Sequence, residues 1–288
     1  MTLTPFLTIR SALMQARQQG LPALEARMLM ECVLKQTPAW LVAHDNEALS
    51  EAEATAYQTL CQRRLGGEPL AYILGWREFY GRQFKVNPAV LIPRPETELL
   101  VDLALEKLTA KFRSAQPFHV LDLGTGSGAI AITLALEAAA RNLPVVVSAS
   151  DISASALAVA RQNAMTLGAN INFIESHWWQ AIPKQSFDLI LSNPPYIEAN
   201  DPHLNQGDLR FEPAHALTDQ ADGLSAYRAL CAGLGAYLAP GGWVLFEHGY
   251  DQAAAVQALL QAQNLQSVQT WPDLAGIPRI SGGQSACE

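Results

Sequence analysis

The feature that most constrains the fold of this 288-residue chain is a glycine-rich turn between a predicted strand and a predicted helix. The apolar run Val120–Leu123 has the length and composition of a buried strand, and an apolar helical pattern begins at Ala129. Between them, Gly124–Gly128 reads Gly-Thr-Gly-Ser-Gly. Glycines let a turn adopt positive φ and let a ligand approach the backbone, while the N–H groups of the following helix face it. The segment therefore predicts a site for a nucleotide-like ligand.

Downstream of residue 95, short apolar runs alternate with helical patterns, which is typical of βαβ units and a parallel sheet. The predicted strands are Val120–Leu123, Val145–Ala149, Asn172–Ile174, Phe187–Ser192 and Trp243–Glu247. Asp151 follows the second strand, where a dinucleotide-binding fold places its ribose-binding acid. Gly124-x-Gly126-x-x-Ala129 fits both NAD and S-adenosylmethionine, so the glycines alone do not choose between them. Asp122 favours the second, because a carboxylate there suits the cationic end of a methionine moiety better than a pyrophosphate.

The N-terminal residues 1–75 carry helical patterns only. A first helix is predicted from an N-cap at Thr4-Pro5 to a stop at Gly20, and a second over Ala23–Lys35. Ser50 and Glu53 match a capping box that begins a third helix. We expect a small helical bundle as a separate N-terminal domain.

Strand-forming residues replace the helical pattern between residues 76 and 95. Gly81 and Asn87-Pro88 interrupt them, and Val90–Ile92 is read as further strand. We interpret residues 76–95 as a β-hairpin linker to an α/β domain over residues 96–288.

A second motif, Asn193-Pro194-Pro195-Tyr196, follows the strand Phe187–Ser192, at the strand end where open α/β sheets bind ligands. Consecutive prolines remove two N–H donors and hold the preceding residues extended, so carbonyl oxygens dominate the loop. With the Asn193 oxygen, the loop suits an NH2 group, and Tyr196 offers a flat face to a planar amide or base. An amide or aryl-amine nitrogen attacks a methyl carbon poorly because its lone pair is delocalised. Accepting both N–H hydrogens aims that lone pair, so the loop predicts methyl transfer to nitrogen without a strong base.

Charge and cysteine content narrow the function classes. The chain has 27 Asp plus Glu against 19 Lys plus Arg, a net charge of −8, which disfavours a broad duplex-binding surface. Its four cysteines and six histidines show no metal-ligand spacing, so neither a metal site nor a disulfide framework is predicted. No signal peptide or membrane-spanning run is recognised. We expect a cytoplasmic monomer that binds neither a membrane nor nucleic acid directly.

The chain resembles the release-factor glutamine methyltransferases, the PrmC or HemK family, over nearly its whole length. The resemblance is carried by Tyr72–Gly75, Glu78-Phe79, Leu91–Glu98, Asp122–Gly128, Asn193–Tyr196, Arg210–Pro213 and Glu247–Gly249. It implies a Rossmann-like seven-strand methyltransferase domain that uses S-adenosylmethionine. It also implies an acceptor, the side-chain amide of glutamine in the Gly-Gly-Gln motif of class 1 peptide chain release factors, held in part by the N-terminal bundle and the hairpin.

The resemblance also implies roles for individual residues. It assigns cofactor binding to Gly124, Thr125, Gly126, Ser127, Gly128, Asp151, Trp178 and Asn193. Among these, Asp151 binds the ribose hydroxyls and Trp178 packs on the adenine. In the acceptor loop, Asn193 and the Pro194 carbonyl accept hydrogen bonds from the glutamine amide, Pro195 keeps the loop rigid and Tyr196 flanks the amide plane. His177 departs from the family, which more often has an aspartate there contacting the adenine amino group.

Other functions remain open at this level. An adenine-N6 nucleic-acid methyltransferase uses the same Asn-Pro-Pro-Tyr loop, but predicts a basic cleft. A nicotinamide oxidoreductase shares the glycine pattern and leaves that loop unexplained, and a non-catalytic adaptor leaves both motifs unexplained. The C-terminal Gly282-Gly283-Gln284 repeats the acceptor tripeptide, and we interpret it as a coincidence in a flexible tail.

Overall fold

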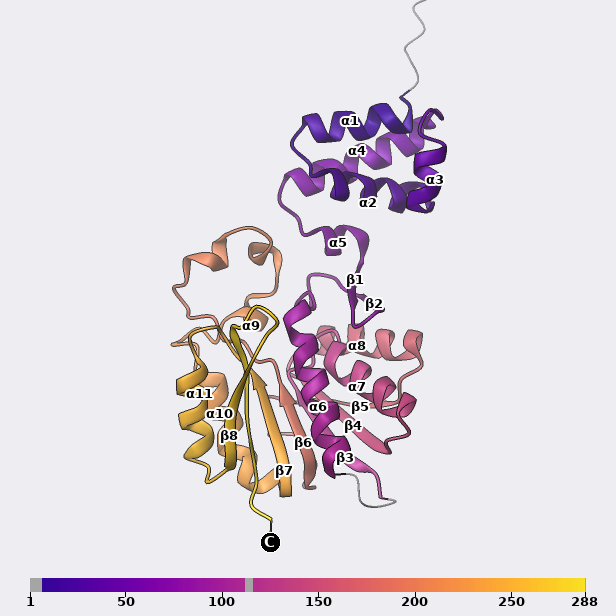
Figure 1. The fold of residues 1–288 in the computed structure, drawn as a ribbon. Helices are drawn as coiled ribbons and strands as arrows, with labels where there is room; N and C mark the ends of the chain where they lie inside the picture. Colours follow the sequence, from indigo (N-terminus) through magenta and orange to yellow (C-terminus); the bar gives the residue numbers. More distant parts are fainter. Residues whose placement is uncertain (1–6, 112–115, 288) are drawn as a thin grey trace, which may run out of the picture. The chain divides into compact units, whose positions relative to one another are not determined.

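The computed structural model describes residues 7–111 and 116–287. It divides the chain into two compact units, Met1–Gly75 and Trp76–Glu288, which are described separately (Figure 1). The first unit is helical, and the second contains a sheet with helices on both faces. The fold class expected from the sequence is confirmed.

The N-terminal unit is a bundle of short helices, α1 (Ile9–Gln18), α2 (Ala23–Leu34), α3 (Pro38–Ala43), α4 (Glu51–Leu65) and α5 (Leu70–Leu74). Their apolar faces share one core that includes Leu29, Met30 and Tyr57. The capping box of α4 is confirmed, because the Ser50 backbone N–H donates to Glu53 at 2.8 Å and the Glu53 N–H donates to the Ser50 hydroxyl at 3.3 Å.

The predicted start of the first helix is wrong. Helix α1 begins at Ile9, because Thr8 accepts the Ser11 N–H at 3.2 Å and the Ser11 hydroxyl accepts the Thr8 N–H at 2.8 Å. This local capping box satisfies the first N–H groups of the helix. The cap expected at Thr4-Pro5 lies outside the described residues.

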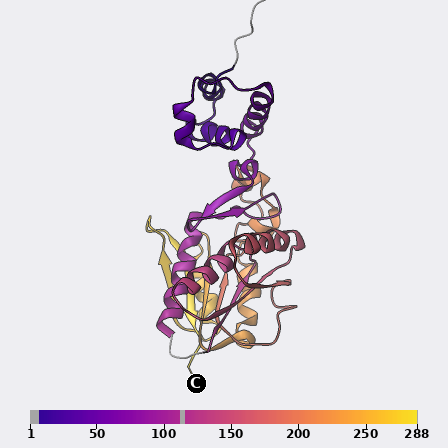
Figure 2. The ribbon, with the colours of Figure 1, turned by 90° about the vertical axis from the view of Figure 1, so that its right-hand side faces the viewer.

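The second unit opens with the predicted hairpin, formed by β1 (Trp76–Phe79) and β2 (Arg82–Lys85) in antiparallel register. Tyr80 and Gly81 have φ of +53° and +72°, the left-handed conformations that a two-residue hairpin turn requires. Phe79 and Phe84 are buried in the core of the second unit. The Tyr80 N–H donates to Glu98, the first residue of α6, so the hairpin lies beside the start of that helix (Figure 2).

Residues 90–92 do not form the strand expected from the sequence. This segment of the described chain is irregular, and the Ile92 N–H donates to the buried Glu212 carboxylate at 3.0 Å instead of to a neighbouring strand. Pro88 and Pro93, which flank the segment, have no N–H to contribute to a sheet ladder.

A seven-stranded sheet with the order β5-β4-β3-β6-β7-β9-β8 forms the centre of the second unit. Its strands are β3 (Phe118–Leu123), β4 (Val145–Asp151), β5 (Ile171–Glu175), β6 (Phe187–Ser192), β7 (Leu238–Glu247), β8 (Gln266–Pro272) and β9 (Pro278–Gln284). The five strands predicted from apolar runs, β3 to β7, are confirmed, and they pair with one another in parallel. Strand β9 pairs antiparallel with both β7 and β8.

The C-terminal glycines are part of the sheet, so their interpretation as a flexible tail is wrong. In β9, Gly282 and Gly283 lie opposite Leu245 and Val244 of β7. A Cβ on Gly282 would stand 2.5 Å from the Val244 carbonyl oxygen, so a side chain there would disrupt the pairing. Gln284 is bound in the same strand, where its side-chain amide donates to the Gly241 carbonyl at 3.1 Å.

Helices cover both faces of the sheet (Figure 1). On one face lie α6 (Glu98–Lys111), α7 (Ala129–Ala140) and α8 (Ala154–Leu167), and on the other lie α10 (Ser225–Tyr237) and α11 (Ala253–Gln261). Leu189 and Leu191 of β6 point into the first core and Ile190 into the second. Strands that are apolar on both faces require helices on both sides. No helix in the described ranges is long and apolar enough to cross a membrane.

Candidate active site

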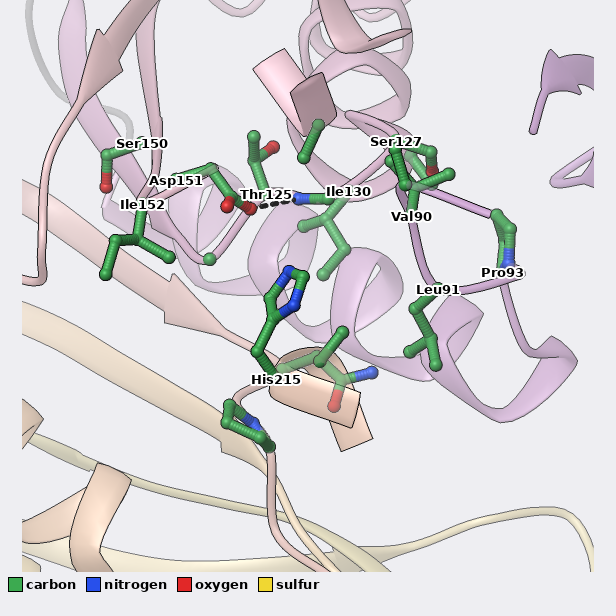
Figure 3. A pocket seen from close by; sticks show the side chains of 18 of the residues that line it. Val90, Leu91, Pro93, Thr125, Ser127, Ile130, Ser150, Asp151, Ile152 and His215 are labelled. Carbon is green, nitrogen blue, oxygen red and sulfur yellow. Dashed lines mark hydrogen bonds between the residues drawn. The ribbon is translucent and has the colours of Figure 1, made fainter. Parts of the chain in front are cut away.

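A large pocket opens at the carboxyl ends of β3, β4 and β6 in the second unit (Figure 3). It is lined by Ala89, Val90, Leu91, Pro93, Arg94, Thr97, Gly124, Thr125, Gly126, Ser127, Ala129, Ile130, Ser150, Asp151, Ile152, Ala156, Ser176, His177, Trp178, Asn193, Pro195, His215 and Ala216. Both sequence motifs therefore meet in one cavity. Within the described ranges, no group of acidic, histidine or cysteine side chains has the arrangement of a metal site.

The glycine loop forms one wall of the pocket. Gly124, Gly126 and Gly128 all have positive φ, at +78°, +55° and +82°. A Cβ on Gly126 would meet nothing within 4 Å, so its open side is free for a ligand. A Cβ on Gly128 would lie 2.7 Å from Ile132 Cδ1, so this glycine is also required for packing, and it does not line the pocket.

Asp122, near the end of β3, binds the glycine loop through Thr125. Its side chain is fully buried, and the Thr125 hydroxyl donates to Oδ2 at 2.7 Å. Burial, reinforced by the nearby Asp151, raises the pKa of Asp122 to about 7. Because Asp122 does not line the pocket, the interpretation that it faces the cationic end of a ligand is wrong.

Asp151 does face the pocket, from the end of β4. Its Oδ2 accepts the Gly126 N–H at 2.9 Å, the bond drawn in Figure 3, and its Oδ1 accepts the Ser153 N–H at 2.9 Å. An ionised carboxylate has about four acceptor positions, so each oxygen of Asp151 can still accept another hydrogen bond. Two backbone bonds therefore hold the carboxylate in place with capacity left for a pair of ligand hydroxyls.

An aromatic pair follows β5. Trp178 has φ of +48°, held by the Ser176 hydroxyl, which donates to the Trp178 carbonyl at 2.8 Å. A Cβ on Gly124 would lie 3.8 Å from the Trp178 ring, so the ring stands against the glycine loop. His177 is exposed at the pocket edge, with its ring tilted 41° from that of Trp178.

The Asn-Pro-Pro-Tyr loop forms the opposite part of the site. Asn193 and Pro195 line the pocket, whereas Pro194 and Tyr196 are absent from its lining. The Asn193 amide nitrogen donates to the Thr97 hydroxyl at 3.2 Å. The side chain of Tyr196 packs with the second core, where burial raises its pKa above the ordinary value.

Hydrogen bonds to neighbouring segments hold the loop at both of its ends. Before it, the Ser192 hydroxyl donates to the Leu123 carbonyl at 2.6 Å, which fixes the end of β6 to the end of β3. After it, the Gln252 amide donates to the Tyr196 carbonyl at 2.9 Å and to the Gly223 carbonyl at 3.1 Å. These bonds hold the acceptor loop at a set position relative to the glycine loop.

Several pocket residues were not identified from the sequence. Thr97 and His215 lie in the lining, and His215 projects into the cavity from the short helix α9 (Ala214–Leu217) (Figure 3). Residues 89–94 form a further part of the wall, held by an ion pair of 2.5 Å between Arg94 and the buried Glu212. The Leu91–Glu98 and Arg210–Pro213 motifs were the signals in the sequence that pointed to this wall, since Glu212 of the second motif binds Arg94 of the first.

Comparisons with known proteins agree with this geometry. Residues 8–75 match the family described as PrmC N-terminal domain, and residues 97–219 match the methyltransferase small domain. The release factor glutamine methyltransferase of Bordetella pertussis is 53% identical over 92% of this chain and 95% of its own length, and that of Neisseria gonorrhoeae is 50% identical over 92% and 94%. The structure of a Thermus thermophilus 16S rRNA N2 G1207 methyltransferase, at 17% identity, covers 73% of this chain and 49% of its own with a TM-score of 0.50.

The seven-stranded sheet, the glycine loop and the methyltransferase domain match define an enzyme of the S-adenosylmethionine-dependent methyltransferase class. The identity to the two curated relatives extends over nearly the whole chain, including the N-terminal unit. The chain belongs to the release factor glutamine methyltransferase family.

Proposed function

We propose that this enzyme transfers a methyl group from S-adenosylmethionine to the side-chain nitrogen N5 of the glutamine in the Gly-Gly-Gln motif of class 1 peptide chain release factors. The observation that carries the proposal is the orientation of Asn193. Its amide nitrogen is engaged by Thr97, so its oxygen is available to accept from an NH2 group in the pocket shared with the glycine loop. The names of the relatives, release factor glutamine methyltransferases, agree with such an acceptor.

The pocket residues fit the cofactor. The open side of Gly126, together with Gly124, Thr125 and Ser127, accommodates the methionine part, while Gly128 sets the turn into α7. The two free acceptor positions of Asp151 match the two ribose hydroxyls, and the Trp178 ring offers a flat apolar face to the adenine. When bound, S-adenosylmethionine supplies a methyl group activated by a positively charged sulfur.

The acceptor loop orients the glutamine amide for attack. Asn193 Oδ1 and the Pro194 carbonyl accept the two N–H hydrogens, which directs the nitrogen lone pair at the methyl carbon. A nitrogen–carbon bond forms as the carbon–sulfur bond breaks and its electron pair remains on sulfur. The nitrogen then carries the positive charge and releases a proton to solvent, so no strong base is required before attack. Pro195 keeps the loop rigid. The side chain of Tyr196 packs with the second core and does not line the pocket, so we assign it to anchoring the loop rather than to flanking the amide plane.

We assign recognition of the release factor to the N-terminal bundle, residues 1–75, and to the hairpin in residues 76–95. The match of residues 8–75 to the PrmC N-terminal domain supports this assignment, because that unit carries none of the pocket residues. Because release factors act in translation, we propose that the enzyme is cytoplasmic. We also propose that it acts as a monomer, because every residue assigned to the cofactor and to the acceptor lies in one chain. The acidic net charge of −8 agrees with a protein substrate rather than a nucleic acid.

Mass spectrometry of a class 1 release factor incubated with the enzyme and S-adenosylmethionine tests the proposal. One added methyl group, located on the Gly-Gly-Gln glutamine, is the expected result. Adenine-containing DNA and RNA, incubated in parallel, are expected to remain unmethylated. Methylated adenine with an unmodified release factor would overturn the acceptor while leaving the class of enzyme intact.

A further inference from the structure

The proline-rich acceptor loop supplies few hydrogen-bond donors with which to hold its own position. Pro194 and Pro195 have no N–H group, and the proposed reaction needs the Pro194 carbonyl free for the substrate amide. The loop therefore has to be held by donors from neighbouring segments. At the end of the loop that donor is Gln252, the residue immediately before α11, whose side-chain amide binds the Tyr196 carbonyl.

Each part of the Gln252 amide has a defined partner. Its Nε2 donates to the Tyr196 carbonyl at 2.9 Å and to the Gly223 carbonyl at 3.1 Å, and its Oε1 accepts the Gly249 N–H at 2.9 Å. A rotated amide would place its oxygen against two carbonyl oxygens and its NH2 group against an N–H group, so only one orientation satisfies all three contacts. Gln252 does not line the pocket, so its effect on the reaction passes through the loop.

The second carbonyl, that of Gly223, belongs to a turn that is itself held by several hydrogen bonds. Asp219 accepts the N–H groups of Gly223 and Ser225 at 3.0 and 2.8 Å, and the Ser225 hydroxyl at 2.7 Å. Gly223 has φ of +74°, and a Cβ there would stand 2.6 Å from the Tyr196 carbonyl oxygen and 2.7 Å from Gln252 Nε2. The turn, the acceptor loop and the start of α11 therefore meet in close contact around one amide group.

The residue after the loop connects this junction to a further part of the pocket lining. The Ile197 N–H donates to the Leu217 carbonyl at 3.0 Å, at the end of α9. Helix α9 contributes His215 and Ala216 to the lining, and His215 projects into the cavity (Figure 3). The position of Tyr196 is therefore coupled both to the acceptor loop and to the helix that carries these two residues.

We propose that Gln252 is a positioning residue, which sets the place of the acceptor carbonyls relative to the methyl donor by holding the Tyr196 carbonyl. The proposal rests on the function proposed above, because only methyl transfer to an oriented amide requires that place. Each proline ring fixes its own φ, so a shift of Tyr196 is carried to the Pro194 carbonyl rather than absorbed within the loop. A displacement of about 1 Å in a reacting geometry costs about 100-fold in rate.

The test compares steady-state methylation of a release factor by the wild-type enzyme and by Gln252→Glu. Glutamate keeps the length of the side chain and an oxygen for the Gly249 N–H, and a carboxylate is favourable at the start of a helix, so α11 is retained. An ionised carboxylate has no proton to donate, so both bonds to the carbonyls of Tyr196 and Gly223 are lost. We expect kcat to fall about 10- to 100-fold, because misplacement of the acceptor slows the transfer itself.

The other kinetic and binding constants separate positioning from a merely structural role. The KM for the release factor and the calorimetric Kd for S-adenosylmethionine are expected to stay within about threefold of the wild-type values, a split that general loosening of the fold would not produce. Gln252→Met replaces the amide by an uncharged group of similar length, and it is expected to lower kcat by about 10-fold or more. This second variant separates the loss of the donor from the added charge.

Gln284→Glu is the matched control. Gln284 is also half-buried and its amide nitrogen also donates to a glycine carbonyl, that of Gly241, at 3.1 Å. It pairs with Trp243, near the start of β7, and lies outside the pocket lining. The Gln284→Glu variant is expected to retain wild-type kcat.

The outcomes separate the positioning role from the proposed function. If Gln252→Glu does not fold by thermal melting, Gln252→Met decides. Wild-type kcat in a folded Gln252 variant, or an equal loss of kcat in Gln252→Glu and Gln284→Glu, overturns the positioning role. Failure of the wild-type enzyme to methylate the release factor instead overturns the proposed function.

Discussion

Asn193 is the residue on which the proposed chemistry depends most directly. We expect Asn193→Ala to lower kcat by about 100-fold or more, because the acceptor amide loses the oxygen that aligns its lone pair. The adjacent glycine loop and Asp151 remain, so the Kd for S-adenosylmethionine is expected to change little. Single-turnover methylation and calorimetry measure the two quantities separately. A variant with wild-type kcat would eliminate the proposed role of Asn193.

Substitution of Asp151 is expected to weaken the binding of S-adenosylmethionine, the quantity that Asn193→Ala leaves nearly unchanged. Removing its carboxylate in Asp151→Ala deletes the acceptors assigned to the ribose hydroxyls and releases the Gly126 N–H, which it binds at 2.9 Å. Since hydrogen bonds to a charged group contribute roughly 1.5–3 kcal/mol, the Kd for S-adenosylmethionine should rise by about 10- to 100-fold in a calorimetric titration.

Ser153→Ala is the control for that experiment. Ser153 caps α8 by accepting the Ala156 N–H at 3.2 Å, and it donates its own N–H to Asp151 through the backbone, which alanine preserves. The Kd of the Ser153→Ala variant for S-adenosylmethionine is expected to stay close to the wild-type value. An equal loss of affinity in both variants would assign the effect to the helix start rather than to the carboxylate.

At the scale of elements, the hairpin and the glycine loop are joined through one side chain of α8. Asn163 accepts the Lys85 N–H at 2.8 Å, and donates to the Lys85 carbonyl at 3.0 Å and to the Ser127 carbonyl at 2.9 Å. Together with the buried Phe79 and Phe84, these bonds make the hairpin an integral part of the second unit. The wall of the cofactor pocket is thereby supported by an element that precedes the sheet in the sequence.

Asn163→Ala should therefore reduce stability. It removes two part-buried hydrogen bonds to the Lys85 backbone and one buried hydrogen bond to the Ser127 carbonyl, a loss of about 2–3 kcal/mol in the free energy of unfolding. Urea denaturation measures this loss, and the exposed neighbour Gln162 provides the control Gln162→Ala. If both variants unfold at the same urea concentration, the hairpin contributes less than its hydrogen bonds indicate.

At the scale of the whole molecule, two buried acids make stability depend on pH. Burial raises the pKa of Asp122 from 3.8, and that of Glu247 from 4.5, to about 7 in each case. At a pH between the ordinary pKa and the raised pKa of each acid, the folded state keeps a proton that the unfolded state has lost. Stability therefore decreases as the pH rises from about 4 to about 7, and it levels off above that range. Each unit of pKa shift corresponds to about 1.4 kcal/mol, so each acid costs on the order of 3 kcal/mol at neutral pH.

Asp122→Asn tests this dependence without altering the acceptor side of the pocket. The amide keeps an oxygen for the Thr125 hydroxyl but has no proton to lose. Compared with the wild type, we expect the variant to gain stability at pH 8 relative to pH 5, measured by urea denaturation at both values. A difference between the two proteins that does not change with pH would show that Asp122 titrates normally.

Much of this molecule follows from local sequence. The five parallel strands were recognised because each is a contiguous apolar run of strand length, and α1, α2 and α4 because their apolar residues recur at helical spacing. The short helices α3 and α5 were not predicted. The glycine loop and the Asn-Pro-Pro-Tyr loop were equally visible, since turn chemistry depends on neighbouring residues. Each of these features is encoded by residues adjacent in the chain.

Only the tertiary structure decided which distant residues complete the site. Thr97 and Asn193 are 96 positions apart and meet because α6 begins beside the end of β6, which no local pattern encodes. Strand β9 was missed because its glycines lack strand propensity, and the sheet accepts them because β7 approaches too closely for a side chain. The sequence by itself determined five of the seven strands of the sheet, three of the N-terminal helices and the two loops of the site. Packing between distant elements decided which side chains face those loops, because such contacts depend on how the whole sheet is ordered.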